Sequence, residues 1–434
     1  MTVTSWCRVL GVIAGLAGTA VVGGVSPCGA IAGPRVTVAV YGDSVVEGYT
    51  VPDYLRYGMV PALGDELARL GGLDLGGAGL IPATPFRWTF NHYVSGAVAA
   101  DPIGWALAGY ASHALDGPSG YSAVAVSPRA TATTAIDATT VGVLFTKHAG
   151  SGVFTVTAGA STWMIDARST GRPTPAEQWL TLPPGAQTIT VHGPSSGSLV
   201  FDGVIARRPV IAGRVQVEME NLGHAGHTLT DDAVPRVGQE LAALRFDVSV
   251  FMAEYIYEYS AQYAPHGAYF EVAYAHALHD YGRRVRAYGG LCLIADNSPL
   301  PLPAAVVARF AAINRREART LGCAHSAAAA GIWNPATAVK DGFVILDGVH
   351  PTPAGYRRIV AALAPAVLRL IRARAHGPGP AGRPRALTDP RRERGLIHRR
   401  PTREGPQTAT QGLLSVPSHL LRPALDRRAS SPLR

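Results

Sequence analysis

Several features that would define a class of protein are scarce in this sequence. Four of its 434 residues are cysteine, and Lys147 and Lys340 are its lysines. All other basic residues are Arg, a bias that is more typical of codon composition than of selection for phosphate contacts. Beyond the first 32 residues no apolar run approaches the roughly 20 residues that a membrane-spanning helix requires. That part of the chain is therefore not expected to cross a bilayer.

The basic charge of the chain is concentrated at its end. The formal net charge is +9, yet Ala375–Arg434 holds 12 Arg and four acidic residues, while the preceding 374 residues carry 27 basic and 26 acidic groups. Because the first 374 residues are nearly neutral, they offer no electrostatic attraction for nucleic acid, and we expect no nucleic-acid partner. Residues 375–434 are rich in Pro, Arg and Gly, which predicts a disordered tail.

The first 32 residues have the pattern of a secretory signal peptide. Arg8 is the positive residue, Val9–Val22 is apolar, and Ala30-Ile31-Ala32 fits the cleavage site. We expect a secreted protein that is cleaved near Ala32. An uncleaved membrane anchor is the alternative, and the short, Gly-rich apolar stretch disfavours it.

Cleavage would leave two cysteines, Cys292 and Cys323. Cys292 lies in a predicted strand, Leu291–Ile294, and Cys323 lies just before another apolar run. Two cysteines in an exported protein are candidates for a disulfide. Two buried free thiols would look the same in the sequence, so both interpretations stay open.

Apolar runs of strand length alternate with helical patterns at both ends of a long central segment. A strand is predicted at Val36–Tyr41 and a helix at Tyr54–Leu70. After Ile211, strands are predicted at 215–218, 246–252, 291–294 and 343–346, and helices at 231–244, 269–281 and 303–320. Thr352 and Pro353 mark the start of a last helix as N-cap and first residue. Such alternation predicts a parallel sheet covered by helices, with functional residues at the carboxyl ends of the strands.

The segment between about Pro82 and Val210 has a different character. Short alternating runs are separated by Gly, Ser and Pro, as at 141–145, 153–156, 187–191 and 199–201, which is typical of a small antiparallel sandwich. The predicted fold is therefore α/β, a three-layer α/β/α parallel sheet with an inserted antiparallel β-sandwich. The expected parts are a signal peptide (1–32), a discontinuous main domain (33–81 and 211–374), the insertion (82–210) and the tail (375–434).

Two short motifs, far apart in the chain, carry the residue types of nucleophilic catalysis. Gly42-Asp43-Ser44 follows the first strand, and Asp347-Gly348-Val349-His350 follows the strand predicted at 343–346. A serine nucleophile needs a base to take its proton, and that base needs an acid to orient it. The alternative is that these are a strand-end turn and a helix-entry turn, which explains Pro351 and Thr352 but not the histidine.

Together these motifs resemble the SGNH, or GDSL, hydrolase superfamily over roughly 34–54 and 211–374. The resemblance implies a flavodoxin-like sheet, with Ser44 as nucleophile, His350 as general base and Asp347 as the residue that orients it. It also implies an oxyanion hole formed by the backbone N–H groups of Ser44 and Gly226, the latter in the run Asn221–Thr228. An ordinary glycine turn is the alternative for Gly226.

The sequence departs from that superfamily at one position. The family usually has Gly-x-Asn-Asp after its middle strand, and the Asn side chain donates to the oxyanion, but 253–259 contains no Asn. Either Tyr255 or Tyr257 supplies a hydroxyl donor instead, or the hole is incomplete and turnover is slow. A weak metal pattern of His and Asp occurs nearby, at His224, His227, Asp231 and Asp232. We expect neither a metal nor an organic cofactor.

The insertion resembles the carbohydrate-binding-like sandwiches of some secreted SGNH esterases. Aromatic rings stack on sugars, so the candidates for substrate contact are Trp88, Trp105, Trp163 and Trp179; the alternative is that most of them are core residues. The expected function is hydrolysis of acyl esters, on carbohydrate or cell-wall glycan. The alternatives are a lipolytic esterase, acyl transfer to a sugar, and a catalytically weak or inactive carbohydrate-binding protein on an SGNH scaffold.

Overall fold

The structure is a computed structural model that describes residues 33–48, 51, 57–83, 104–114, 121–183, 188–223, 244–252 and 267–377. All of these lie in the first of two units, Met1–Ala381 and Gly382–Arg434, into which the chain divides. The predicted signal peptide (1–32) and residues 378–434 of the predicted tail lie outside the described residues. No helix within the described ranges is long and apolar enough to cross a membrane.

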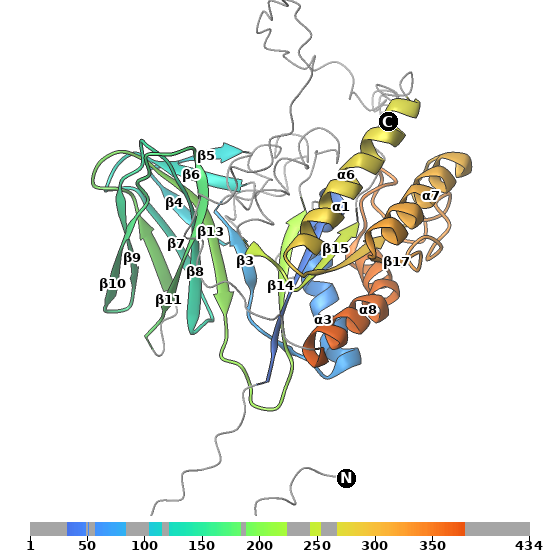
Figure 1. Ribbon diagram of the computed structural model, residues 1–434, viewed down its shortest axis with the longest axis horizontal. Helices are drawn as coiled ribbons and strands as arrows, with labels where there is room; N and C mark the ends of the chain where they lie inside the picture. The colour runs from blue at the N-terminus through green and yellow to red at the C-terminus, as the bar shows by residue number, and fades with distance from the viewer. Residues whose placement is uncertain are drawn as a thin grey trace, which may run out of the picture. The chain divides into compact units, whose positions relative to one another are not determined.

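A six-stranded sheet carries the main part of the fold (Figure 1). Its order is β17-β16-β15-β1-β14-β2, and every neighbouring pair is parallel. The strands are β1 (Arg35–Gly42), β2 (Asp74–Leu75), β14 (Gln216–Gly223), β15 (Val248–Met252), β16 (Leu291–Ala295) and β17 (Ala324–Ser326). Parallel neighbours need crossover connections, and the intervening helices supply several of them.

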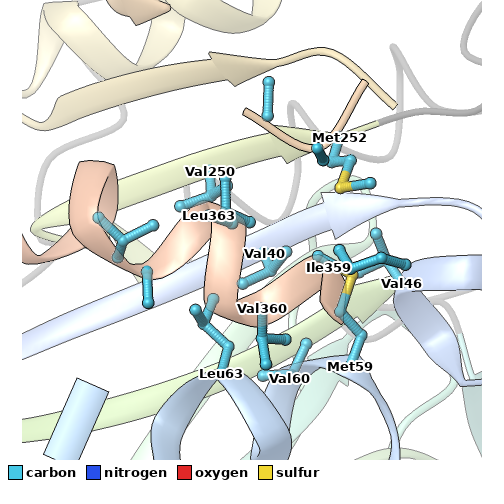
Figure 2. Close-up of a cluster of buried hydrophobic side chains, with 14 of the residues drawn as sticks. Val40, Val46, Met59, Val60, Leu63, Val250, Met252, Ile359, Val360 and Leu363 are labelled. Carbon is cyan, nitrogen blue, oxygen red and sulfur yellow. The ribbon is translucent and has the colours of Figure 1, made fainter. Parts of the chain in front are cut away.

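Helices cover both faces of this sheet. α3 (Met59–Gly71) and α8 (Pro353–His376) share one buried cluster with the sheet, and α6 (Gly267–Ala287) and α7 (Ala304–Leu321) share the other. Figure 2 shows the first cluster, in which Val40 and Val250 of the sheet meet Leu63 of α3 and Leu363 of α8. Burial of these apolar side chains is the main force that holds the layers together. The mixed α/β fold predicted from the sequence is confirmed.

The segment between β3 and β14 forms two antiparallel sheets. One has the order β10-β9-β12-β7-β4, and the other has β11-β8-β13-β6-β5 with β3 added beside β13. The first contains β4 (Ala106–Ala108), β7 (Thr131–Ala135), β9 (Val153–Ala158), β10 (Ser161–Asp166) and β12 (Thr188–His192). The second contains β3 (Gly79–Pro82), β5 (Tyr110–Ala114), β6 (Tyr121–Ala125), β8 (Thr140–Lys147), β11 (Thr174–Thr181) and β13 (Leu199–Arg207). A third apolar cluster draws on strands of both sheets, with Phe145 meeting Phe154 edge to face.

The antiparallel strands are joined to the parallel sheet by a mixed apolar and ionic contact. Leu144 of β8 and Ile205 of β13 belong to the same buried cluster as Tyr41 of β1. Beside them Arg207 of β13 forms a two-pronged ion pair with the buried Glu218 of β14. The antiparallel strands β8 and β13 therefore pack against the parallel sheet at β1 and β14.

The structure differs from the sequence expectation near the C-terminal motif. Residues 343–346, predicted as a strand, form no strand; Val344 makes an isolated bridge to Pro351 and the chain turns back at once. The sheet instead includes β2 and β17, neither of which was predicted from the sequence. Most of the predicted helix at 231–244 lies outside the described residues. A disulfide joins Cys292 of β16 to Cys323, the residue before β17.

Candidate active site

Ser44 lies at the carboxyl end of β1, in a tight connection to a short helix. A Cβ on Gly42 would lie 2.2 Å from the carbonyl oxygen of Met252, so the strand end leaves room only for glycine. Asp43 then caps α1 (Ser44–Glu47), because its carboxylate accepts a hydrogen bond from the N–H of Val45 at 3.0 Å. Gly42 and Asp43 therefore each have a structural role in the turn that places Ser44.

His350 and Asp347 lie in a turn before α8. The carboxylate of Asp347 accepts hydrogen bonds from the backbone N–H groups of Val349 at 2.8 Å and His350 at 3.0 Å. The N–H of Ile345 donates to the carbonyl of His350, which closes the turn. The helix begins at Pro353, and Thr352 caps it by accepting from the N–H of Gly355.

The fold joins the two motifs by side-chain hydrogen bonds. Ser44 Oγ lies 2.8 Å from Nε2 of His350, across 306 positions of sequence, and Nδ1 of His350 lies 2.5 Å from Asp347 Oδ2. When Nδ1 carries the proton and donates it to Asp347, Nε2 is free to accept the hydroxyl proton of Ser44. The arrangement has the chemistry of an activated nucleophile.

The surroundings keep Asp347 charged and the other two groups buried. Burial acts to raise the pKa of Asp347, but hydrogen bonds from the His350 ring and from the backbone N–H groups outweigh it, so the pKa lies below its ordinary value. Ser44 is 1% exposed and His350 is 9% exposed. A carboxylate that stays ionised can orient a neutral imidazole and stabilise the imidazolium that forms when it takes a proton.

Packed rings and a guanidinium support the turn. The ring of Phe343 stacks nearly parallel to the indole of Trp333 at 5.9 Å, and the guanidinium of Arg358 lies over the Phe343 ring at 3.9 Å. The indole N–H donates to the carbonyl of Pro299, in the loop after β16. The stack thus ties the turn to α8 and to the neighbouring strand end.

Two polar residues at the carboxyl edge of the sheet, Asn221 and Asp296, hold neighbouring elements together by hydrogen bonds. The sequence did not predict this role for either of them. Asn221, at the end of β14, donates to the carbonyl of Glu47 at 3.2 Å and accepts from the N–H of Gly223 at 3.0 Å. It therefore ties α1 to the neighbouring strand. The Asn-Leu-Gly run that held the glycine motif was the available signal.

The second of these polar residues follows β16. The buried Asp296 accepts hydrogen bonds from the amide of Asn314 at 2.9 Å and from the His325 ring, whose Nε2 lies at 3.1 Å. Tyr274 in turn donates to Asn314 at 2.9 Å. These residues come from α6, α7, β17 and the loop after β16, so no local sequence pattern marks them as a group.

Several predicted site residues lie outside the described residues: Gly226, Tyr255, Tyr257, Trp88, His224, His227, Asp231 and Asp232. The structure therefore brings together Ser44, Asp347 and His350 of the predicted set. Among the described residues, no group of three or more His, Cys, Asp or Glu side chains is placed to hold a metal ion.

The three described tryptophans of the insertion are engaged in packing. Trp105 is 2% exposed and its indole N–H points to the carbonyl of Ile81, so the expectation that it contacts substrate is wrong. Trp163 packs against the apolar cluster of the antiparallel sheets. The ring of Trp179 is covered by the guanidinium of Arg207 at 3.7 Å. The aromatic rings that suggested stacking on sugars pack against protein side chains instead.

No known protein-family profile matches the sequence, and no curated protein matches it. Among solved structures, a peptidoglycan O-acetylesterase is similar, with a TM-score of 0.56 over 78% of this chain and 92% of that chain, at 18% identity. This likeness shows that the two chains share a fold.

Two other esterases are more distant in structure. A family two carbohydrate esterase from Cellvibrio japonicus covers 68% of this chain and 98% of its own, with 10% identity and a TM-score of 0.28. The acetylxylan esterase Axe2 from Geobacillus stearothermophilus covers 36% and 73%, with 15% identity and a TM-score of 0.28. At such TM-scores neither bears on the fold of this chain.

Proposed function

We propose that the protein is a secreted serine esterase of the SGNH type, with a main domain of residues 33–81 and 211–374 and an inserted β-sandwich of residues 82–210. The observation that carries the proposal is the hydrogen-bond chain from Ser44 through His350 to Asp347. A local turn has no need of an imidazole aimed at a serine 306 positions away.

In the first half of the reaction Ser44 Oγ attacks the ester carbonyl carbon. His350 takes the hydroxyl proton on Nε2, and Asp347 stabilises the resulting imidazolium. As the first residue of α1, Ser44 has a backbone N–H with no acceptor inside the helix, so that N–H is available to the developing oxyanion. Gly226, and Tyr255 or Tyr257, are proposed as its further donors.

Collapse of the tetrahedral intermediate releases the alcohol, which receives the proton from His350. An acyl group is left on Ser44. Water then attacks this acyl enzyme with His350 again as base, and the acid is released while Ser44 recovers its proton. The cycle needs no redox change, because every bond formed or broken involves a proton and an acyl group.

We propose acyl esters on a carbohydrate or cell-wall glycan as the substrate class. The shared fold with a protein named for peptidoglycan O-acetyl ester cleavage supports this choice. Export by the N-terminal segment, with cleavage near Ala32, would bring the enzyme to such a substrate. The proposal assigns the basic segment 375–434 no part in the reaction.

The first experiment compares hydrolysis of p-nitrophenyl acetate by the wild-type protein and by Ser44→Ala. We expect the variant to lose at least about a thousandfold in kcat, since a missing nucleophile disables the whole hydrogen-bonded unit. A fluorophosphonate probe should label the wild type but not the variant. Ser169→Ala, which alters a serine in the connection between β10 and β11, is the matched control and should keep full activity.

Acetate release from O-acetylated peptidoglycan and from acetylated xylan then tests the substrate class. Equal, negligible rates for the wild type and Ser44→Ala on every ester would reject an enzyme and leave a binding protein on this fold. Hydrolysis of p-nitrophenyl acetate without release from either glycan would retain the esterase and reject the glycan substrate.

A further inference from the structure

The exposed face of the sheet β10-β9-β12-β7-β4 carries two aligned rows of side chains in which threonine predominates. Along β9, Phe154 and Val156 are buried while Thr155 and Thr157 alternate with them on the other face. Register places one row as Thr162, Thr157, Thr190 and Thr133, and the next as Met164, Thr155, His192 and Thr131. Thr133 and Thr190 lie 3.0 Å apart through their hydroxyl oxygens.

One end of this face is hollowed. The hollow measures about 340 Å³, within the range of small-molecule sites, and is lined by Pro128, Val153, Thr155, Met164, His192, Gly193 and Ser195. Apart from the titratable His192, none of these lining side chains is charged. Nε2 of His192 lies 3.2 Å from Thr157 Oγ1, which fixes the ring against the sheet.

Two turns that hydrogen-bond to each other build the wall of the hollow. The N–H of Gly193 donates to the carbonyl of Ala130 at 2.8 Å, and the N–H of Ser195 donates to that of Val153 at 3.2 Å. A Cβ on Gly193 would lie 2.0 Å from the carbonyl oxygen of Ser127, so only glycine permits this approach. The wall is therefore held in place by backbone contacts.

The lining offers apolar and polar surfaces that match the C–H face and the hydroxyl groups of a sugar ring. Val153, Pro128 and Met164 offer apolar surface to a face of C–H groups, while Thr155, His192 and Ser195 offer donors and acceptors to hydroxyls. The lining itself carries no fixed charge, and Asp166, which lies opposite Val153 on β10, is already paired with Arg168. We propose that this hollow binds one ring of a neutral glycan and that the adjoining threonine rows hold the rings next to it.

This inference rests on the proposed function for the choice of a glycan, but the binding itself needs no catalysis. The hollow would hold the acylated polymer by its sugar rings. The residues that react with the ester belong to a different part of the chain. The hollow also replaces the predicted tryptophan contacts, because Trp105, Trp163 and Trp179 are engaged in packing.

The test uses the full chain with Ser44→Ala, so that no ester is turned over. Isothermal titration measures binding of two neutral probes, xylohexaose and the hexamer of N-acetylglucosamine. We expect saturable binding of at least one probe. Met164→Arg should weaken it tenfold or more, because it puts a long, charged side chain at the hollow; Met164 is 78% exposed, so folding is not at risk. His192→Ala should weaken binding severalfold.

Gln178→Arg is the matched control, since it adds the same charge at an exposed position of the other antiparallel sheet. It should bind as the unsubstituted chain does. Raising the salt from about 50 to about 500 mM should change Kd by less than about twofold, because neither probe nor lining carries a fixed charge.

The proposal is overturned if neither probe binds, if Met164→Arg binds unchanged, or if binding weakens steeply with salt. Hydrolysis of p-nitrophenyl acetate by Met164→Arg with Ser44 intact separates this result from the esterase proposal. Full hydrolysis without glycan binding rejects the hollow alone. Glycan binding by a protein that hydrolyses no ester rejects the esterase alone.

Discussion

At the scale of single residues, the site depends on which nitrogen of His350 carries the proton. Asp347 is placed to hold that proton on Nδ1, through the 2.5 Å contact and the two backbone N–H groups that fix its carboxylate. The pKa of Asp347 lies below its ordinary value, so the carboxylate is ionised at neutral pH. Its contribution to stability is therefore present at neutral pH and lost as pH falls through the lowered pKa.

Asp347→Asn should lower kcat for p-nitrophenyl acetate by about a hundredfold to ten-thousandfold, because an amide favours the wrong tautomer of His350. The loss should be smaller than for Ser44→Ala, since the Asp347 side chain is 39% exposed and water can partly replace it. Asp341→Asn, at an exposed position six residues upstream, is the control. An Asp347→Asn rate within threefold of the wild type would contradict the assigned role.

At the scale of elements, sequence patterns predicted the sheet strands well where burial is continuous. The strand predicted at Val36–Tyr41 is β1, and that at Leu291–Ile294 is β16. The start of α8 was also predicted, since Thr352 and Pro353 act through contacts within one helical turn. Residues 343–346 are as apolar as a strand, but two hydrogen bonds between Ile345 and its near neighbours fold them into a turn instead.

The disulfide connects the start of β16 to the residue before β17, at the edge of the parallel sheet. Cys292 and Cys323 are 31 positions apart, and closing a loop of that length should stabilise the fold by about 3–4 kcal/mol in the chain-entropy view. The double variant Cys292→Ala, Cys323→Ala should lose about that much free energy of unfolding in urea denaturation.

Reduction of the wild type with dithiothreitol is the matching measurement and should give the same shift. An unfolding midpoint that is unchanged in both experiments would show that the bridge adds nothing to stability.

At the scale of the whole molecule, the contact between the parallel sheet and the antiparallel strands buries two carboxyl groups but pairs only one of them with a described basic side chain. Glu218 and Glu220 lie two residues apart on β14, and both are fully buried. Arg207 pairs with Glu218, whereas no described basic side chain forms an ion pair with Glu220. Burial and the neighbouring Glu218 raise the pKa of Glu220 well above its ordinary value, against the opposing effect of Arg207.

The raised pKa of Glu220 makes stability depend on pH. The folded chain holds the proton of Glu220 more tightly than the unfolded chain, which releases it above about pH 4.3, so this group costs stability as pH rises from there toward the raised pKa, by up to about 1.4 kcal/mol per pH unit. Glu220→Gln cannot ionise, so its advantage over the wild type should grow as pH rises above about 4.3. Urea denaturation at each pH measures it.

Glu218→Gln serves as the contrast. It removes the carboxylate that pairs with the half-buried Arg207 and should lower stability at every pH. If the wild type and Glu220→Gln gave parallel curves of stability against pH, the carboxyl of Glu220 would not be held neutral by the fold.

Local and periodic information in the sequence determined the elements and the two reactive motifs, because caps, turns and alternating burial depend on residues a few positions apart. The pairing of Ser44 with His350 was expected only through the resemblance to a known superfamily, because local patterns do not show which distant groups come together. Only the tertiary structure decided that Ser44 and His350 lie 2.8 Å apart, that Trp105 is core, and that Asp296 gathers partners from two other elements. Those outcomes depend on how sheets and helices pack, and packing is a property of the whole chain.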